Sequence, residues 1–250
     1  MLWYKAWLET RVRFVICLLA MTVFCVYTVS YDNQMADSRA TLNFYYSVVH
    51  GAHGLIGGLW LAVISFLTAG GLLREKAVGA ASFTLALPFS RTRLMGVRMA
   101  VCLIEAVALI VIPSLAICIE DGMIGKPYPV SQMWFHIVLL VSGGLVFFAI
   151  ALLISSLMEG EYTAPLVSFC IVAGVALSTS REPKLATGST IWEQAAQTHN
   201  PFYFMRGVAY FDSPTGLLLD PIPWVQAGIF VLLAALFITA SVKAIQLRDF

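Results

Sequence analysis

The sequence predicts an all-α integral membrane protein with six transmembrane helices, and two observations indicate this fold class. Apolar residues make up 60% of the 250 residues and charged residues only 12%, against about 25% charged residues in a soluble domain; the mean hydropathy is +0.85. The apolar residues also form continuous runs of about 20, the length that a helix needs to cross a bilayer, whereas barrel strands would alternate. This composition excludes a soluble enzyme, a disordered chain and a secreted disulfide-linked domain.

The apolar runs divide the chain into spans and connections within a single transmembrane domain, 1–250. The expected transmembrane helices are 14–30, 45–73, 94–119, 133–157, 162–178 and 222–245. Residues 179–221 form the longest connection, which is polar at first and then aromatic. Its segment 202–211 is apolar enough to dip into the membrane interface but too short to cross the membrane.

Lysine and arginine predict the orientation of these spans. Ten of the 15 basic residues fall on the side of the two termini, and the other five are diluted over the opposite connections. Because basic residues concentrate on the cytoplasmic side, both termini should be cytoplasmic, in the inner (plasma) membrane, and 179–221 external. The net charge of +1 provides no basic surface for a nucleic acid partner.

Residues 1–13 have the pattern of an interfacial helix before the first span. Trp3, Trp7 and Phe14 recur at helical spacing, and Lys5, Glu9 and Arg13 recur at i, i+4 on another face. Tryptophans prefer the headgroup level of a membrane, so we expect a helix that lies in the interface and contacts membrane lipid. The alternative is a plain cytoplasmic extension of the first span.

The connection between the second and third spans is the most informative segment. A charged triplet, Arg74-Glu75-Lys76, leaves the membrane, and a weakly amphipathic stretch follows it. Pro88 stops a helix near Leu87, and Ser90 is placed to cap the next one. A short cytosolic helix over 75–87 is therefore expected, with an ordinary connecting loop as the alternative.

The motifs of this connection resemble a known family. Arg-Glu-Lys-x-x-Gly followed by Leu-Pro-x-Ser-Arg resembles the first cytoplasmic loop of ABC-2 type permeases, the membrane subunits of ABC transporters. The residues that carry this resemblance are Arg74, Glu75, Lys76, Gly79, Leu87, Pro88, Ser90 and Arg91. The interfacial helix is similar to the family's elbow helix, and Asn200-Pro201 followed by aromatic residues resembles a segment before its last span.

The resemblance implies a transport mechanism. Residues 75–87 would be a coupling helix seated in a separate ATPase subunit, with Glu75 facing basic groups of that partner and Arg91 bonded to the partner or to lipid phosphates. Two ATPase copies and a second permease chain, identical or related, are implied, and the subunit would serve export. The sequence contains no GxxxxGK[ST] phosphate-binding loop. ATP and Mg²⁺ would thus be bound and ATP hydrolysed by the partner, and this chain would be no enzyme and bind no cofactor.

A few residues inside the predicted spans have more than one interpretation. Glu105 is either a polar point of the translocation route or clasp between helices, or a glutamate that reaches the cytosolic boundary. His50 and His53 share a helical face, but no third ligand is evident, so a polar outer mouth is favoured over a metal site. Gly54 and Gly58 form a small-residue face suited to a dimer contact or to packing against the first span.

A secondary transporter or channel that works without an ATPase is the alternative function. That class would need broken helices or several buried charges in matching halves of the chain, and Glu105 alone offers one. An intramembrane protease is disfavoured, because both HExxH and Gly-x-Ser-Gly are missing from the sequence. Replacing Glu75 discriminates between the remaining two, since it should uncouple only an ABC permease.

Overall fold

A computed structural model of the chain describes residues 2–35, 54–68, 91–125, 129–158, 163–178, 200–207, 210 and 223–246. Every regular element in these ranges is an α-helix, which confirms the all-α prediction for this part of the chain. The helices are α1 (Leu2–Met35), α3 (Gly54–Leu67), α6 (Arg91–Met123), α7 (Val130–Leu157), α8 (Thr163–Ser178), α10 (Pro201–Arg206) and α11 (Trp224–Gln246).

Each of the six predicted spans overlaps one helix of this set, although the span 45–73 is described as a helix only over Gly54–Leu67, and α10 is additional. Four helices, α1, α6, α7 and α11, are long and apolar enough to cross a membrane. The apolar helices α3 and α8 are shorter, with 14 and 16 residues, or about 21 and 24 Å at 1.5 Å per residue. A bilayer core is about 30 Å thick, so four crossings follow from helix length and six remain a prediction.

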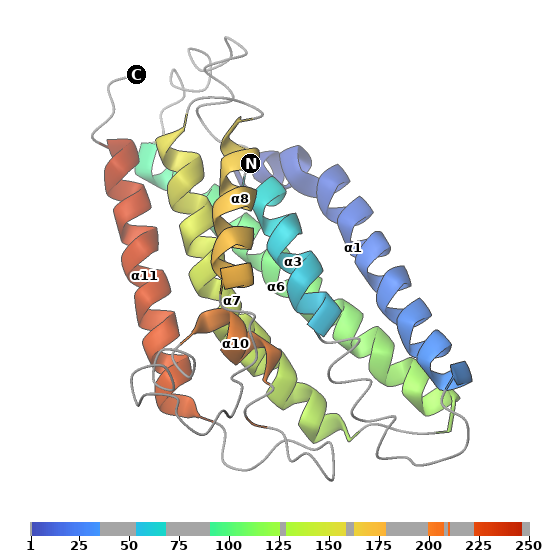
Figure 1. Cartoon of the computed structure of the whole chain (residues 1–250). Helices are drawn as coiled ribbons and strands as arrows, with labels where there is room; N and C mark the ends of the chain where they lie inside the picture. Colours follow the sequence, from blue (N-terminus) through green and yellow to red (C-terminus); the bar gives the residue numbers. More distant parts are fainter. Residues whose placement is uncertain are drawn as a thin grey trace, which may run out of the picture.

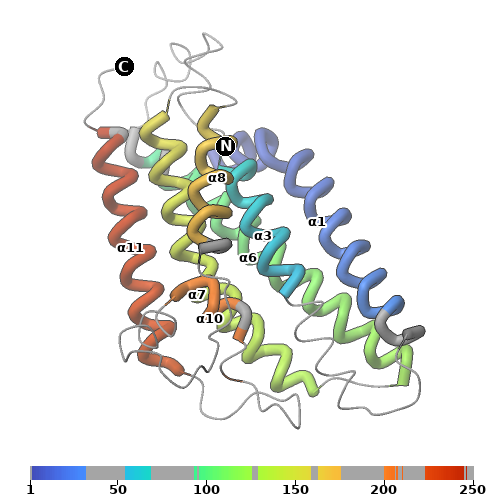
Figure 2. The backbone as a smooth tube through the Cα atoms, viewed as in Figure 1, coloured from blue at the N-terminus to red at the C-terminus, as the bar shows by residue number. Residues whose placement is uncertain are grey.

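The long helices pack side by side as a bundle, with α1 and α11 on opposite flanks and α6 and α7 between them (Figures 1 and 2). The start of α1 and the end of α11 lie at the same end of the bundle (Figure 1), called here the terminal end. In the stretches suited to spanning, 67% of the residues of α7 are buried, against 22% for α1 and for α11. Helix α7 is thus the centre of the bundle.

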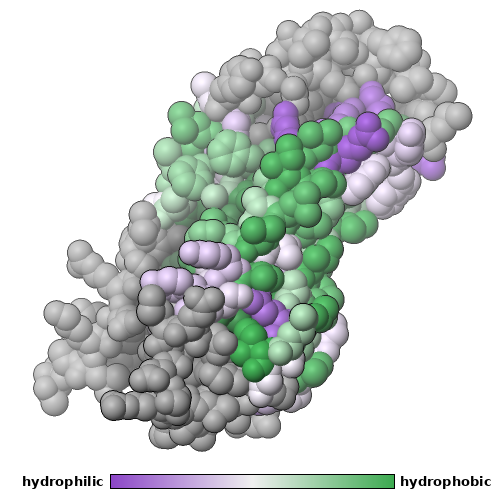
Figure 3. All heavy atoms as spheres, turned by 90° about the vertical axis from the view of Figure 1, so that its right-hand side faces the viewer, coloured by the Kyte–Doolittle hydropathy of each residue, from purple (hydrophilic) through white to green (hydrophobic). Residues whose placement is uncertain are grey.

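Two apolar clusters hold the helices together. The larger joins α1, α3, α6 and α7 and includes Met21, Ile64, Leu109 and Phe147. The smaller joins α7, α10 and α11 through Leu139, Val146, Phe204, Ala227 and Phe230. The outward faces are apolar as well, and Figure 3 shows this surface on the flank formed by α1. An exposed apolar surface of this size is normal for a protein whose surroundings are lipid.

Helix α1 is continuous over its 34 residues, without a break between the predicted interfacial helix 1–13 and the predicted span 14–30. Figure 1 shows its first turns lying at an angle to the long remainder. The helical character of 1–13 is therefore confirmed from Leu2 onward. Its place in the membrane interface stays a prediction.

Candidate functional site

The start of α6 is the described structure nearest to the predicted coupling loop. The helix begins at Arg91, three residues before the predicted start and directly after Ser90, the expected cap. The residues from Arg74 to Ser90, the predicted coupling helix 75–87 and both His50 and His53 lie outside the described residues, as does the side chain of Arg91. The site is therefore defined by what holds α6 and α3, the helices on either side of that loop.

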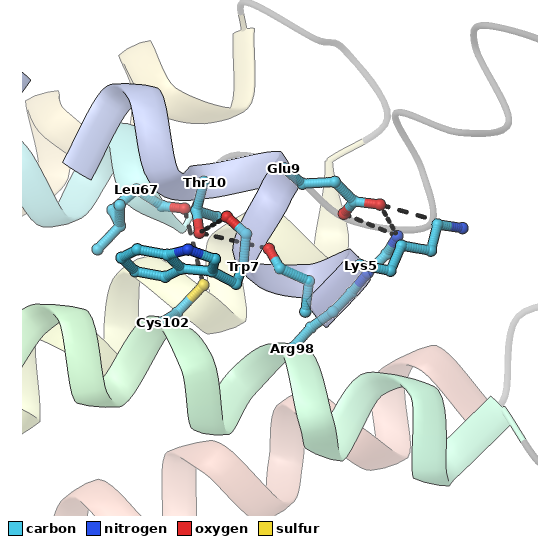
Figure 4. A network of polar contacts seen from close by, with 8 residues as sticks. Lys5, Trp7, Glu9, Thr10, Leu67, Arg98 and Cys102 are labelled. Atoms are coloured by element: carbon cyan, nitrogen blue, oxygen red, sulfur yellow. Dashed lines mark hydrogen bonds and ion pairs between the residues drawn. The ribbon is translucent and has the colours of Figure 1, made fainter. Parts of the chain in front are cut away.

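An ion pair joins the start of α6 to α1 (Figure 4). Arg98 Nη2 donates to Glu9 Oε1 and Oε2 at 3.1 and 3.0 Å. The Arg98 side chain is 8% exposed and that of Glu9 38%. Lys5 lies one turn before Glu9, with its Nζ 4.0 Å from Glu9 Oε1. Because the guanidinium is shielded from water on α6, its attraction to the carboxylate is screened less than that of a surface pair.

A second contact between the same helices lies deeper in the bundle. Glu105 is 1% exposed, and its Oε1 accepts a hydrogen bond from Thr10 Oγ1 (Figure 4 shows Thr10 beside Glu9). No described residue contacts Glu105 Oε2 through a hydrogen bond. The geometry is that of a clasp between helices rather than that of a side chain reaching for water.

Helices α3 and α6 are also bound to each other. Trp60 Nε1 donates to the carbonyl oxygen of Ala106 at 2.7 Å, and Cys102 Sγ lies 3.9 Å from the carbonyl oxygen of Leu67 (Figure 4). Leu67 is the last residue of α3, so the second contact joins the helix that enters the predicted coupling loop to the helix that leaves it. Together with the α1 contacts, this makes α1, α3 and α6 one connected unit.

The far end of α6 carries two carboxylates that sequence reasoning left outside the span. The third span was predicted to end at 119, but α6 continues to Met123. Ser30 Oγ of α1 donates to Glu120 Oε1, and Asp121 is 0% exposed. In the sequence these two residues are visible only as an acidic pair directly after an apolar run. Its burial could not be predicted, because it depends on the neighbouring helices.

The two hydroxyl–carboxylate contacts constrain the shape of α1. Thr10 and Ser30 are 20 residues apart on α1, whereas Glu105 and Glu120 are 15 apart on α6. At 1.5 Å per residue these intervals are about 30 and 22 Å. The interval on α1 is the longer one by about 8 Å, which agrees with the angle in the first turns of α1 in Figure 1.

The predicted Asn-Pro-aromatic segment forms the short helix α10. Asn200 Oδ1 accepts from Phe202 N at 2.9 Å, Pro201 occupies the first turn, and Gly207 ends the helix at a φ of 66°. This φ lies in the left-handed region that glycine adopts without strain. Phe204 is fully buried and packs edge-on against Phe230 of α11, with ring centroids 4.9 Å apart.

Helix α10 packs against the middle of α7 rather than near its end. A Cβ placed on Gly143 would lie 2.7 Å from the carbonyl oxygen of Pro201, and Gly143 is 13 residues into α7, about 20 Å along its axis. The sequence predicts that this segment dips only into the membrane interface, whereas α10 lies about halfway along α7.

After α10, the hydroxyl of Tyr210 donates to Gln226 Oε1 of α11. Burial, together with the nearby Tyr203, raises the pKa of Tyr210, so the phenol is neutral at physiological pH and keeps its donor proton.

The glycines that make close contacts differ from those singled out in the sequence. No described atom comes within 4 Å of a Cβ built on Gly54 or Gly58, so the described part of α1 does not pack on that face. Gly57, between them, meets Leu140 and Met205 at ordinary distances. The shortest distances between a built Cβ and a described atom occur at Gly143 and Gly144 of α7. A dimer contact through Gly54 and Gly58 stays a prediction.

The described residues contain no group of three or more histidine, cysteine, aspartate or glutamate side chains suited to a metal ion. The polar groups instead join helices to each other at the two ends of α6.

The comparisons with known proteins give a family. A family model described as "ABC-2 family transporter protein" matches residues 40–211, while a comparison with curated proteins gives no match. The matched part exceeds half of the 250 residues and contains α3, α6, α7, α8 and α10 together with the predicted coupling loop. With its apolar helices this is a multi-pass membrane protein and a transport component. The chain therefore belongs to the ABC-2 transporter family, as a membrane permease of an ABC transporter.

Proposed function

We propose that this chain is the permease subunit of an ATP-driven exporter, driven through residues 74–91 by a separate ATPase. The observation that carries the proposal is the family match over 40–211, which includes that loop. The contacts on either side of the loop support it, since α3 and α6 are joined by the Trp60–Ala106 and Cys102–Leu67 contacts. A push on the loop would therefore move both helices together.

The Glu9–Arg98 ion pair extends this unit to α1. Closure of two ATPase subunits around ATP would displace the coupling helix 75–87. The displacement would pass to α6 at Arg91, to α3 at Leu67 and to α1 through Arg98. Movement of a packed unit against the rest of the bundle is a common form of switching between two states. Helix α11, which packs with α7 and α10 in the smaller apolar cluster, would be the counterpart of this movement.

The remaining parts of the complex follow from the same proposal. Two ATPase copies would bind ATP and Mg²⁺, and a second permease chain would complete the pathway, as a homodimer or with a related subunit. The permease would lie in the inner (plasma) membrane with both termini in the cytoplasm. The lysine and arginine side chains that the structure describes support this orientation, because all of them lie at the terminal end. They are Lys5, Arg11, Arg13, Arg93, Arg98 and Lys243.

Co-purification tests the proposal. The tagged protein is isolated from its native cells in a mild detergent, and its partners are identified by mass spectrometry. We expect a stoichiometric ATPase with a phosphate-binding loop. The double variant Glu75→Ala/Arg91→Ala should lose it, because the variant removes two of the four charged side chains of residues 74–91.

The matched control is Arg181→Ala/Glu182→Ala, an arginine–glutamate pair in the predicted external loop. This control should retain the ATPase. Absence of any ATPase in a detergent that preserves known transporter complexes would contradict the proposal. The secondary transporter or channel would then be the better explanation, and Glu105, buried in α6, would be the first residue to replace.

A further inference from the structure

Charge is distributed unevenly along the bundle. The described lysine and arginine side chains all lie at the terminal end, as noted above. At the opposite end, the described carboxylates are Glu120 and Asp121 of α6. Two carboxyl groups are therefore placed there with no described lysine or arginine beside them.

Asp121 is the unusual member of this pair. It is 0% exposed, and neither of its carboxylate oxygens has a hydrogen-bond partner among the described residues. Glu120 Oε1 accepts from Ser30 Oγ of α1, but Glu120 Oε2 is shielded from water and likewise has no described partner. Three acceptor atoms on two adjacent residues are thus withdrawn from water without a donor from the part of the chain that the structure describes.

An ionised carboxylate in this position is unfavourable unless a cation or a donor pairs with it. Moving an ionised carboxylate out of water costs more free energy than a single hydrogen bond recovers, and buried carboxylates are normally paired. The rest of the cluster offers Asp121 no compensation, since the one described hydroxyl donor, that of Ser30, is used by Glu120. The missing partner should carry positive charge and several N–H donors.

The surroundings indicate at which depth this partner would lie. Tyr27 and Tyr31 of α1, on either side of Ser30, are 63% and 46% exposed, and their rings stack with centroids 6.2 Å apart. Exposed tyrosines on a transmembrane helix mark the level of the lipid headgroups. A metal ion is disfavoured, because the described residues contain no set of three ligating side chains.

We propose that Ser30, Glu120 and Asp121 form a binding site for the primary ammonium group of an amine at the headgroup level. An ammonium group supplies one positive charge and three N–H donors, and the unpaired carboxylate oxygens of Glu120 and Asp121 have neither among the described residues. A trimethylammonium group has the same charge but no N–H donor. The amine can belong to a lipid headgroup or to a soluble molecule. Binding at this site does not require an ATPase, so its test is independent of the test of the function proposed above.

Native mass spectrometry of the purified full-length protein tests the lipid source. Phosphatidylethanolamine and phosphatidylcholine with identical acyl chains are titrated, because they differ only in the primary or trimethylated ammonium. Propylammonium, followed as a competitor, tests the soluble source. We expect the wild type to bind phosphatidylethanolamine about tenfold more tightly than phosphatidylcholine, or propylammonium about tenfold more tightly than trimethylpropylammonium. A tenfold difference in affinity is about 1.4 kcal/mol, the size expected for one well-made interaction.

Asp121→Asn and Glu120→Gln should each abolish this preference. The matched control is Glu105→Gln, a buried carboxylate on the same helix that also accepts from a hydroxyl of α1; it should keep the preference. Thermal melting of each variant without ligand verifies folding, and either of the two site variants suffices if the other does not fold. Equal binding of primary and trimethylated forms by the wild type, or a preference that survives both site variants, would overturn the proposal.

Discussion

Two adjacent glycines on α7 determine how closely α3 and α10 approach the central helix. A Cβ on Gly144 would lie 2.8 Å from Trp60 Cη2, and one on Gly143 would lie 2.6 Å from Met205 Cγ as well as against the Pro201 carbonyl oxygen. A methionine side chain can move aside, but a backbone carbonyl cannot do so without shifting α10. The absence of a side chain at these positions is therefore part of the packing.

Gly143→Ala tests this packing. The added methyl group overfills the contact with α10, so the free energy of unfolding should fall by roughly 1–3 kcal/mol. Unfolding by SDS titration of the purified protein measures the change. The control is Gly174→Ala on α8, where no described atom lies within 4 Å of a Cβ and the expected change is a gain of up to about 1 kcal/mol, because alanine favours a helix more than glycine does. Equal stability of the two variants would contradict the described contact.

The ion pair between Glu9 and Arg98 should couple α1 to α6 energetically. A double-mutant cycle of Glu9→Ala and Arg98→Ala should give an interaction energy of roughly 1 kcal/mol or more, because the two groups share two hydrogen bonds and Arg98 is buried. The control cycle uses Lys5 and Glu9, whose side chains are 41% and 38% exposed and 4.0 Å apart. That cycle should give a value near zero. Similar interaction energies from both cycles would show that the Glu9–Arg98 pair couples α1 to α6 no more strongly than an exposed ion pair does.

At the scale of elements, α10 is a short helix whose ends are specified locally. Asn200 caps its start, Pro201 pre-sets the first turn, and Gly207 ends it. These are general signals of helix start and stop, so the sequence could indicate a helix here. Its position against the middle of α7 could not be predicted, because it depends on a glycine about 60 residues earlier in the chain.

Asn200→Ala should loosen α10 without unfolding the bundle. Loss of an asparagine cap typically costs about 1 kcal/mol, so the amides of Phe202 to Arg206 should exchange with deuterium several-fold faster. Hydrogen exchange followed by mass spectrometry measures this locally. Asn200→Ser retains a capping oxygen and should exchange like the wild type. Faster exchange in both variants would mean that a contact other than the cap had been lost.

At the scale of the whole molecule, the charges of the described residues predict the orientation in the membrane. Because the described lysines and arginines gather at the terminal end, a fluorescent protein fused to the C-terminus should fold in the cytoplasm and fluoresce. Alkaline phosphatase at the same position should be inactive. Both results should reverse for fusions inserted after Lys126, in the connection between α6 and α7. The opposite pattern would invert the topology and with it the proposed ATPase side.

The sequence by itself determined the fold class and the positions of the helices, because apolar runs of spanning length depend only on local composition. Helices α7, α8 and α11 begin and end within three residues of the prediction. Helix α1 has no break at 13, α6 extends through Glu120 and Asp121, and α3 is described only over Gly54–Leu67 of the predicted span 45–73. The motif at 74–91 also sufficed to indicate the family, which the match over 40–211 confirms.

Only the tertiary structure decided which polar residues act together. Glu105 stood out as a carboxylate in an apolar run, but its partner Thr10 lies 95 residues away, and the partner of Arg98 lies 89 away. Which of several glycines permits close approach depended in the same way on Trp60 and Pro201. Local patterns specify a helix and its apolar face, whereas a contact between helices depends on the rotation and depth of both, and these are set by the packing of the whole bundle.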